Sequence, residues 1–272
     1  MKKTFSYLLL FAITFIISTF ILSCTDDPLP LPELKGSVQL NFDNVVGAKD
    51  LKLGTDTYVN AAGENFTVSK LNYYISNIKF IAANGKNFTV PQDSSYFLIR
   101  EGNADSQQIT INKVPEGNYT GIEFMIGIDS LKSVSDPSKR KGILDTNTGP
   151  TNEEAMYWDW NPGYIFLMLE GTADSATSAN GKYYYHIGGF GGRTEKTLNN
   201  IRTAKIDFGS QKATVPRNAS TQINLKADIL KVFNGPTKLS IKEHTGVMFT
   251  PFSKNIADNY MSMFSLDQII NK

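Results

Sequence analysis

The chain has 272 residues, of which 41% are hydrophobic and 11% aromatic, so it is long enough to bury the core of one large β domain or two small ones. Its formal net charge is +1, and its one basic run, residues 139–141, stands without other basic or aromatic clusters. This composition lacks the basic surface of a nucleic-acid-binding protein, and we interpret residues 139–141 as a solvated loop.

The first 23 residues have the pattern of a secretory signal. Lys2 and Lys3 form a basic start, residues 7–22 form an apolar stretch, and small or apolar residues precede Cys24. The apolar stretch is shorter than the roughly 20 residues that a spanning helix needs, and no stop-transfer charges follow it. We therefore expect no transmembrane helix in the mature protein. Removal of the leader takes two of the 27 basic residues and none of the 26 acidic ones, which leaves a net charge of −1.

Cys24 is the only cysteine, so no intramolecular disulfide can form. Residues 21–24, Ile-Leu-Ser-Cys, resemble the lipobox of bacterial lipoproteins, in which the cysteine is acylated. We expect lipidation rather than a reactive thiol, and each buried CH₂ of an acyl chain contributes about 0.8 kcal/mol to membrane binding. Asp26 and Asp27 resemble the export signal of some Bacteroidetes lipoproteins. They favour an outer-membrane protein exposed on the cell surface, with the periplasmic face of that membrane as the alternative.

The chain is expected to have three parts. Residues 1–23 are the signal peptide, and residues 24–35, which contain three prolines, form an extended tether that starts at the lipidated cysteine. Residues 36–272 form one folded domain. No internal repeat of fixed period is evident.

The domain begins with short strands. In residues 37–43 apolar and polar side chains alternate, which is typical of a strand with one buried face. Residues 66–68 and 73–81 are rich in aromatic and β-branched side chains and predict two more strands. Asn84-Gly85 then precedes an apolar run at residues 88–90, and it predicts a hairpin with a type I′ turn.

The same patterns predict seven further strands, at residues 96–99, 108–111, 119–126, 164–169, 183–187, 204–208 and 223–227. We expect the strands at 164–169 and 183–187 to pair. Residues 129–154, rich in turn formers, predict a long loop with one helical turn. Residues 229–233 predict a helical turn, and residues 256–270 a helix docked on the sheet. The fold class is therefore all-β: an antiparallel β-sandwich with a long loop before the Trp-x-Trp strand and a short C-terminal helix, with an open barrel as the alternative.

Residues 156–171 contain both tryptophans of the chain, Trp158 and Trp160. If this segment is extended, both indoles project from one face, because side chains alternate along a strand. Residues 164–169 then form an apolar run that fits a strand buried on both faces. Two interpretations remain open: a core strand with an aromatic lead-in, or paired indoles that mark a binding site.

Hydrolytic chemistry is not supported by the sequence. The chain has two histidines, its only cysteine is expected to be lipidated, and no Gly-x-Ser-x-Gly elbow occurs. The glycine-rich residues 188–192 lack the spacing of a phosphate-binding loop and predict a tight connection. We therefore expect a non-enzymatic protein.

A calcium loop is also disfavoured. Asp145 and Asn147 resemble the opening of such a loop, with Glu153 and Glu154 further on, but the glycine comes one place early and Met156 stands where the closing glutamate belongs.

The two histidines are the candidate metal ligands. His186 ends an aromatic strand and adjoins the glycines, which allow a ligand to come close. His244 lies near Met248, and imidazole with thioether is a suitable ligand set for copper, with thioether favouring Cu(I). The alternative is that both histidines are structural.

Six segments in order carry a resemblance to a known family. They are residues 73–78, 127–130, 156–166, 169–171, 185–189 and 259–264, with sequences such as Met-Tyr-Trp-Asp-Trp-Asn-Pro-Gly-Tyr and Tyr-His-Ile-Gly-Gly. The chain resembles the MbnP-like family over nearly all of its mature length. That family is named for a periplasmic copper-binding protein associated with methanobactin operons, and its Bacteroidetes members are mostly uncharacterised lipoproteins.

The resemblance implies a copper site made of histidines and a tryptophan oxidised to kynurenine. His186 is the matching ligand, and Trp158 or Trp160 the matching candidate for oxidation. One position departs from the family: where many relatives have histidine in the opening strand, this chain has Asn44 in Phe-Asp-Asn-Val-Val-Gly. An amide is a much poorer copper ligand than imidazole, so a histidine-rich site cannot form here.

The leading hypothesis is a lipid-anchored envelope protein that binds or handles copper through His186 and His244, with no other cofactor. The rival is a surface module that binds glycan or peptide on an aromatic platform of Trp158, Trp160 and Tyr164. A third hypothesis is a scaffold that assembles with an envelope protein partner.

Overall fold

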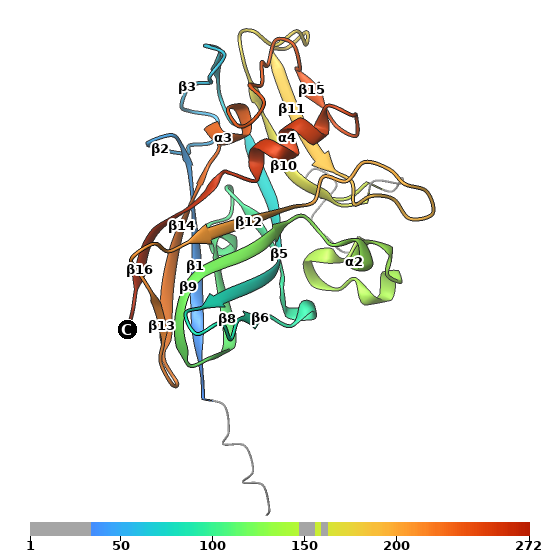
Figure 1. Ribbon diagram of the computed structural model, residues 1–272. Helices are drawn as coiled ribbons and strands as arrows, with labels where there is room; N and C mark the ends of the chain where they lie inside the picture. The colour runs from blue at the N-terminus through green and yellow to red at the C-terminus, as the bar shows by residue number, and fades with distance from the viewer. Residues whose placement is uncertain (1–33, 147–155, 159–162) are drawn as a thin grey trace, which may run out of the picture. The chain divides into compact units, whose positions relative to one another are not determined.

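The computed structural model describes residues 34–146, 156–158 and 163–272 (Figure 1). Within these residues the strands form a five-stranded sheet, called the smaller sheet, a nine-stranded sheet, called the larger sheet, and one two-stranded ribbon. The predicted signal peptide and residues 24–33 of the predicted tether lie outside the described residues, whereas Lys35, the last residue of that tether, already begins a strand. Among the described residues, no helix has the length and apolar character to cross a membrane.

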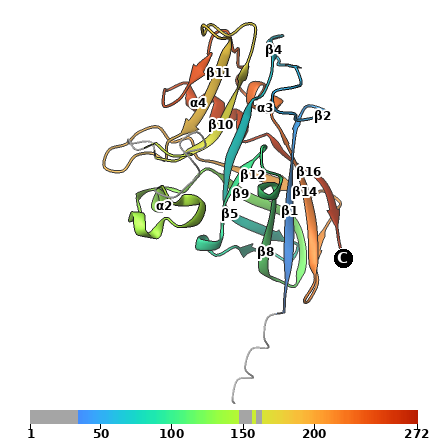
Figure 2. The ribbon, with the colours of Figure 1, turned by 180° about the vertical axis from the view of Figure 1, so that it is seen from behind.

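The smaller sheet has the order β16-β14-β1-β2, with β8 also paired to β1. Its strands are β1 (Lys35–Val46), β2 (Lys49–Asp50), β8 (Gln108–Pro115), β14 (Ser220–Asp228) and β16 (Phe264–Ile270). β1, β14 and β16 lie side by side in both ribbon views (Figures 1 and 2). The strand predicted at residues 37–43 is therefore the centre of this sheet.

The larger sheet has the order β12-β9-β5-β10-β11-β15, with β13 paired to β9, and β6 and β7 paired to β5. Its strands are β5 (Lys70–Ala82), β6 (Phe88–Thr89), β7 (Tyr96–Arg100), β9 (Gly117–Ile126), β10 (Ile165–Thr172), β11 (Lys182–Gly188), β12 (Arg202–Asp207), β13 (Ala213–Val215) and β15 (Gly246–Val247). β10 and β11 pair antiparallel, as predicted.

The remaining elements are short. β3 (Tyr58–Val59) and β4 (Asn65–Phe66) make the ribbon, and the α-helices are α2 (Ser130–Val134), α3 (Leu230–Phe233) and α4 (Ser253–Tyr260). The 3₁₀ turns are η1 (Gln92–Ser94), η2 (Ala104–Gln107), η3 (Pro137–Lys139) and η4 (Gly142–Leu144). The loop predicted at residues 129–154 thus contains one α-helix and two 3₁₀ turns up to residue 146, and its remainder lies outside the described residues.

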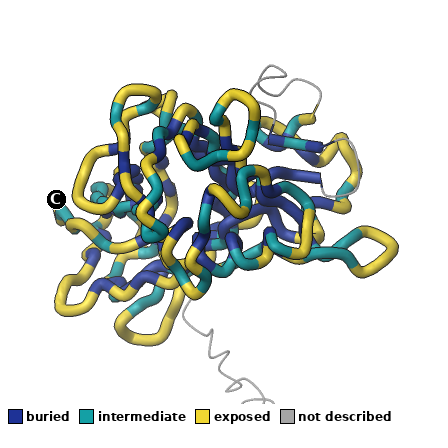
Figure 3. The backbone as a smooth tube through the Cα atoms, turned by 90° about the horizontal axis from the view of Figure 1, so that it is seen from above, coloured by how far each residue is buried: buried dark blue, intermediate teal, exposed yellow. Residues whose placement is uncertain are grey.

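Apolar side chains from both sheets meet in the main core. Phe42 of the smaller sheet contacts Phe124 of the larger sheet edge-on, with ring centroids 6.0 Å apart, and Phe264 packs on both rings. Figure 3 shows buried backbone along the strands and exposed backbone at the turns. This arrangement confirms an all-β sandwich whose core follows from the alternating pattern of its strands.

Two strand pairs are parallel: β1 with β14, and β11 with β15. The other pairs are antiparallel, as the sequence predicts. The parallel pairs were not foreseen because each joins segments far apart in the chain, and alternation does not reveal which strand becomes the neighbour.

Two local predictions need correction. The hairpin around Asn84-Gly85 is present, but the turn hydrogen bond runs from Gly85 N to Ala82 O and Asn84 has no positive φ, so the turn is not type I′. The tail is not one helix: α4 ends at Tyr260 and β16 follows. The apolar spacing of residues 264–270 fits a helix, but pairing with β14 decides the structure.

Candidate metal centre

The outer face of the larger sheet, which points away from the smaller sheet, holds the predicted ligand His186. On β11, Tyr183, Tyr185 and Ile187 face the main core, so Tyr184 and His186 face outward. On β10, Leu167 and Leu169 face the core, so Met168 and Glu170 face outward. The alternation of the two paired strands therefore gathers an imidazole, a thioether and a carboxylate on one surface.

His186 is bound to Glu170. The distance from His186 Nε2 to Glu170 Oε1 is 2.7 Å, and the two side chains are 19% and 30% exposed. This hydrogen bond lowers the pKa of Glu170, against the opposing effect of burial, and the charges of Lys70 and Lys182 lower it further. Since an ionised carboxylate only accepts hydrogen bonds, Nε2 carries a proton, and Nδ1 is the other ring nitrogen. Glu170 therefore orients His186 and selects Nδ1 as the ligand atom.

A methionine lies beside His186 on the neighbouring strand. Met168 lies directly opposite His186 in the β10–β11 register. On the other side, Tyr185 pairs with Val247 of the parallel strand β15, and Met248 follows directly after the end of that strand. Side chains of directly opposed residues have Cβ atoms about 5 Å apart. Glu170 and Met168 were not predicted as site residues. The predicted pairing of the strands on either side of the loop at residues 173–181 contains the signal that could have placed both of them near His186.

Trp158 covers the end of β11 on this same outer face. A Cβ atom at Gly188 would lie 2.8 Å from Trp158 Cζ3 and 2.4 Å from Tyr164 O, so only glycine allows the indole to pack here. Gly188 is two residues beyond His186, about 7 Å along the strand. Trp158 N donates to Gly163 O at 2.7 Å, which holds Trp158 close to the residues before β10. The structure thus brings Trp158 and His186 to one side of the sheet.

Trp158 belongs to a second apolar cluster that fills the outer face. Its buried members are Tyr74, Leu98, Ile128, Leu144, Met156, Trp158, Tyr164, Ile165, Phe166, Met168 and Phe190. Tyr164 donates its hydroxyl hydrogen to Leu144 O at 2.6 Å. The chain after β9 therefore folds back over the larger sheet and buries aromatic residues there.

The aromatic platform predicted for glycan or peptide is contradicted by the burial of Trp158 and Tyr164, the two of its three residues that the structure describes. Trp158 is 8% exposed and Tyr164 is 1% exposed, so neither ring presents a face to solvent. Trp160 lies outside the described residues. The basic run is also more than a solvated loop: Arg140 is buried and donates from Nη1 to Tyr157 Oη at 3.2 Å, while Lys139 and Lys141 are exposed.

His244 has a different environment from His186. Its ring stacks on Phe252 with centroids 3.5 Å apart, in the loop before β15. Glu64 holds this loop, since its carboxylate accepts from Ile241 N at 2.7 Å and from Lys242 N at 2.9 Å. Within the described residues, no three His, Cys, Asp or Glu side chains are grouped as a metal site. The calcium candidates Asn147, Glu153 and Glu154 lie outside the described residues.

Asn44 lies on the opposite side of the larger sheet from His186. Its Nδ2 donates to Glu101 Oε2 at 2.9 Å, and its Oδ1 accepts from the hydroxyl of Tyr73 at 2.8 Å, in the space between the sheets. Residue 44 and His186 therefore cannot bind one metal ion in this fold. The position where the family resemblance implies a histidine therefore lies away from the outer face.

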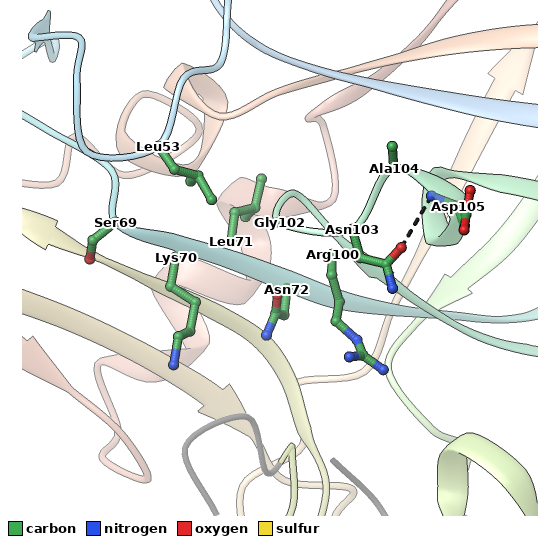
Figure 4. Close-up of a pocket in the computed structure, with 10 residues that line it drawn as sticks. All are labelled: Leu53, Ser69, Lys70, Leu71, Asn72, Arg100, Gly102, Asn103, Ala104 and Asp105. Carbon is green, nitrogen blue, oxygen red and sulfur yellow. Dashed lines mark hydrogen bonds between the residues drawn. The ribbon is translucent and has the colours of Figure 1, made fainter. Parts of the chain in front are cut away.

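A cavity of about 540 Å³ opens beside β5 on the far side of Met168. Figure 4 shows Lys70, Asn72 and Arg100 extending to one side of β5 and Leu71 to the other. Asn72 lies opposite both Met168 and Arg100 in the strand registers. The cavity therefore borders the row of side chains that leads across the sheet to His186.

The comparisons with known proteins agree with the resemblance found in the sequence. The model of the MbnP family matches residues 35–249. Among solved structures, MbnP from Methylosinus trichosporium superposes with a TM-score of 0.51 at 15% sequence identity, covering 78% of this chain and 83% of that chain. At this identity the structural likeness shows a shared fold. A search of curated proteins finds no match.

Proposed function

Because this chain belongs to the MbnP family, we propose that it binds copper at the outer face of the larger sheet, with His186 as the central ligand. The observation that carries this proposal is the hydrogen bond between His186 Nε2 and Glu170 Oε1 at 2.7 Å. Histidines that bind metals commonly donate their second N–H to a carboxylate, which fixes the ring and raises its basicity. The pair thus has the arrangement of a ligand with its supporting acid.

The side chains around His186 fit copper. Imidazole suits copper in either oxidation state, and Met168, which lies opposite His186, adds a soft donor. Copper would contact His186 through Nδ1, and Glu170 would hold the ring from the other side. His244, stacked on Phe252, has no carboxylate partner of this kind among the described contacts, and we assign it a structural role.

Trp158 is the residue we propose for oxidation to kynurenine, in which dioxygen as the oxidant cleaves the C2–C3 bond of the indole to give N-formylkynurenine, and water then releases the formyl carbon as formate. It lies over Gly188 on the same face as His186, and this proximity supports the assignment suggested by the family resemblance. A peptide mass spectrum of protein purified from its native envelope checks it. We expect the peptide that contains Trp158 to carry the mass change of tryptophan to kynurenine, and the His186→Ala variant to carry unmodified tryptophan.

The copper proposal is tested by equilibrium dialysis of the mature chain with Cys24→Ser. We expect one copper ion per chain, and loss of that ion in His186→Ala. The matched control is His244→Ala, which removes the other histidine and is expected to keep the metal. Equal copper retention by wild type and His186→Ala would contradict the proposal.

We further propose that the protein acts without catalysis, on the cell envelope, anchored by acyl chains on Cys24. The lipobox-like residues 21–24 support this, and Asp26-Asp27 supports exposure on the outer surface. Growth with a labelled fatty acid tests the anchor: the wild-type chain should incorporate the label, and Cys24→Ser should not. Protease treatment of whole cells then distinguishes the outer surface from the periplasmic face.

A further inference from the structure

We infer that one end of the domain docks on a membrane surface by binding the anionic phosphates of lipid headgroups. This end, called the basic pole, comprises the start of β1 and three turns next to it, at residues 34–36, 83–87, 112–118 and 216–219. The inference rests on the proposed function, because the acyl chains proposed on Cys24 bring this end of the domain to the membrane. It goes further by naming the protein surface that contacts the lipid and the lipid chemistry that this surface recognises.

Backbone hydrogen bonds hold the four segments of the basic pole together. The start of β1 is bonded to the turns on both its sides, and the hairpin turn before β6 is bonded to the turn between β8 and β9. The bonds run from Glu116 N to Leu34 O at 2.8 Å, from Asn218 N to Lys35 O at 3.1 Å, and from Ala83 N to Asn118 O at 3.0 Å. In Figure 1 the start of β1 lies at the lower end of the domain, close to β8 and β13. The basic pole is therefore one continuous surface.

The basic pole carries a net positive charge, although the mature chain as a whole does not. It has four basic side chains, Lys35, Lys86, Lys113 and Arg217, and one acidic side chain, Glu116, so its formal net charge is +3. All five side chains are exposed. Basic residues near a membrane are attracted to anionic headgroups. An anionic lipid surface therefore attracts the basic pole and repels the acidic remainder of the domain, which orients the protein.

A cavity of about 420 Å³ lies within the basic pole. Lys35 and Lys113 line it together with Ser37, Asn112 and Asn218. Ammonium, hydroxyl and amide N–H groups donate hydrogen bonds, and phosphate oxygens accept them. No carboxylate is found among the described residues that line this cavity. The cavity therefore has the chemistry of a seat for one headgroup phosphate.

A β-bulge keeps Lys113 at this cavity. The β1–β8 register shifts between Gly36 and Ser37, which makes Lys113 the extra residue on β8. Asn112 and Lys113 are consecutive and both exposed, so the bulge breaks the alternation and holds the ammonium group outside the core. Lys113 has a φ of 59° and Asn218 a φ of 54°, and they are two of the three non-glycine residues with positive φ in the described part of the chain. Such strained conformations concentrate at functional sites.

Gly36 allows the turn at residues 216–219 to pack closely on β1. A Cβ atom at Gly36 would lie 2.3 Å from Pro216 O and 2.8 Å from Ala219 O, so only glycine fits there. This close approach places Arg217 next to the start of β1. The bulge on one side and the turn on the other thus bring basic side chains to both sides of the point where the tether joins the domain.

The tether is short enough to keep the basic pole near the membrane. Ten residues, 24–33, separate the proposed acylation site from the first described residue, and a chain of ten residues spans at most about 35 Å. The first described residue, Leu34, is an exposed apolar side chain, which suits the boundary between headgroups and acyl chains. The other end of β1 lies about 36 Å away along the strand. The basic pole is therefore the end of β1 that faces the lipid.

The first test is vesicle flotation of the mature chain with Cys24→Ser, so that no acyl chain contributes to binding. Vesicles of phosphatidylcholine alone are compared with vesicles of equal parts phosphatidylcholine and phosphatidylglycerol at low ionic strength. We expect the chain to float with the anionic vesicles only, and sodium chloride to release it, because salt screens the attraction between exposed charges. Equal flotation with both kinds of vesicle, or flotation with neither, would overturn the inference.

The second test uses Lys113→Gln, Arg217→Gln and the double variant. Both side chains are exposed, so the fold is expected to persist, which circular dichroism checks. We expect each single variant to weaken binding to the anionic vesicles about fivefold, and the double variant about 25-fold, as the contribution of one basic side chain near a membrane implies. The matched control is the double variant Lys49→Gln and Lys52→Gln, which removes two exposed lysines at the other end of β1 and should leave binding unchanged. Equal losses in both double variants would show that net charge alone governs binding, and the basic pole would be wrong.

A third measurement separates a lipid surface from a site for free phosphate. Calorimetric titration of inorganic phosphate into the same Cys24→Ser chain is expected to show no saturable binding. Saturable binding of inorganic phosphate that Lys113→Gln abolishes, without flotation on anionic vesicles, would assign the cavity to the free ion and overturn the docking surface.

The outcomes also separate this inference from the proposed anchor. If the wild-type chain incorporates labelled fatty acid but the Cys24→Ser chain shows no preference for anionic vesicles, the anchor stands and the basic pole is wrong. If no label is incorporated while Lys113→Gln and Arg217→Gln weaken flotation, the anchor is wrong and the basic pole binds the membrane by itself. Copper binding at His186 is measured independently of both results.

Discussion

Two glutamates on opposite sides of the larger sheet have opposite environments. Glu101, in the space near Asn44 and Tyr73, has a raised pKa because burial outweighs the hydrogen bond from Asn44, and Asp50 and Asp43 add repulsion. Glu170, on the outer face, has a lowered pKa because His186 donates to it. Between the sheets, the amide of Asn44 donates to Glu101 and accepts from Tyr73, whereas on the outer face the imidazole of His186 contacts Glu170 through Nε2. We expect the first arrangement to stabilise the fold and the second to support the proposed copper site.

A third carboxylate, Glu64, is the most fully hydrogen-bonded of the three. Burial alone would raise the pKa of Glu64, but hydrogen bonds from Asn60, Lys242 N, Ile241 N and Ser240 lower it to about 2. The folded pKa lies below the unfolded value, so its stabilisation is present above pH 4.5 and is lost as the pH falls toward 2. We expect Glu64→Gln to lower the free energy of unfolding at pH 7 by about 2 kcal/mol, less than the full shift of the pKa implies because solvent screens this partly exposed carboxylate, and to flatten its dependence on pH in that range.

Urea unfolding at pH 7, 5 and 3 measures this effect. Glu243→Gln is the matched control, because Glu243 is exposed on the turn that Glu64 holds. Equal loss of stability in both variants would show that Glu64 has no special role.

The network between the sheets is broken by Asn44→Leu. This change removes the donor to Glu101 and the acceptor for Tyr73, and an unsatisfied buried polar group is costly. We expect a loss of about 2 kcal/mol in the free energy of unfolding, with copper binding unchanged. Asn41→Leu, on the same strand but paired with Asn224, controls for loss of an amide. Reduced copper binding in Asn44→Leu alone would contradict the separation of the two sides.

The outer face is perturbed by Gly188→Ala. The new methyl group would approach Tyr164 O and Trp158, so the indole must move. We expect a loss of about 1 to 2 kcal/mol in stability, as for other overpacked sites, together with a shift of tryptophan fluorescence. Gly85→Ala is a control for loss of a glycine, since open space surrounds that position although its φ of 78° adds backbone strain. An unchanged fluorescence spectrum in Gly188→Ala would count against the packing of Trp158 on β11.

The smallest effect on stability is expected from Glu170→Gln. Half-exposed ion pairs contribute little, so the free energy of unfolding should fall by less than about 1 kcal/mol. The copper affinity should fall by about tenfold, because the amide no longer holds the imidazole as a carboxylate does. Calorimetric titration with copper and urea unfolding measure the two effects on one sample. A larger loss of stability than of affinity would place Glu170 with the structural carboxylates.

Most of the sandwich could be predicted from the sequence because local patterns determine it. The alternation at Val38, Leu40 and Phe42 marks the central strand, and the run after Gly163 marks β10. Short strands such as β13 and β15 were missed, since two or three residues show no period, and β16 became a strand only through its distant partner β14. Pairing between distant segments is a property of the whole fold.

Of the residues in the candidate site, the sequence predicted the central ligand, His186. His186 was identified by its residue type and its neighbouring glycines, but Glu170 and Met168 depend on the β10–β11 register. The expected role of Trp158 and Tyr164 as an exposed platform failed because aromatic residues beside a turn can pack inward equally well. The exposed fraction of these side chains decides whether they can form a platform, and residue type does not determine that fraction.

The parallel pairing of β1 with β14 has a consequence for the order of folding. Ser37 pairs with Ser220, so the central strand of the smaller sheet cannot pair with β14 until a segment 183 residues later in the chain is present. Contacts of such long range are slow to form, because the loop between them must close first. While the chain is synthesised, β1 keeps an unpaired edge until the last fifth of the sequence is available. A chain with this topology suits transport in an unfolded state, because its sandwich cannot close before nearly all of it has arrived.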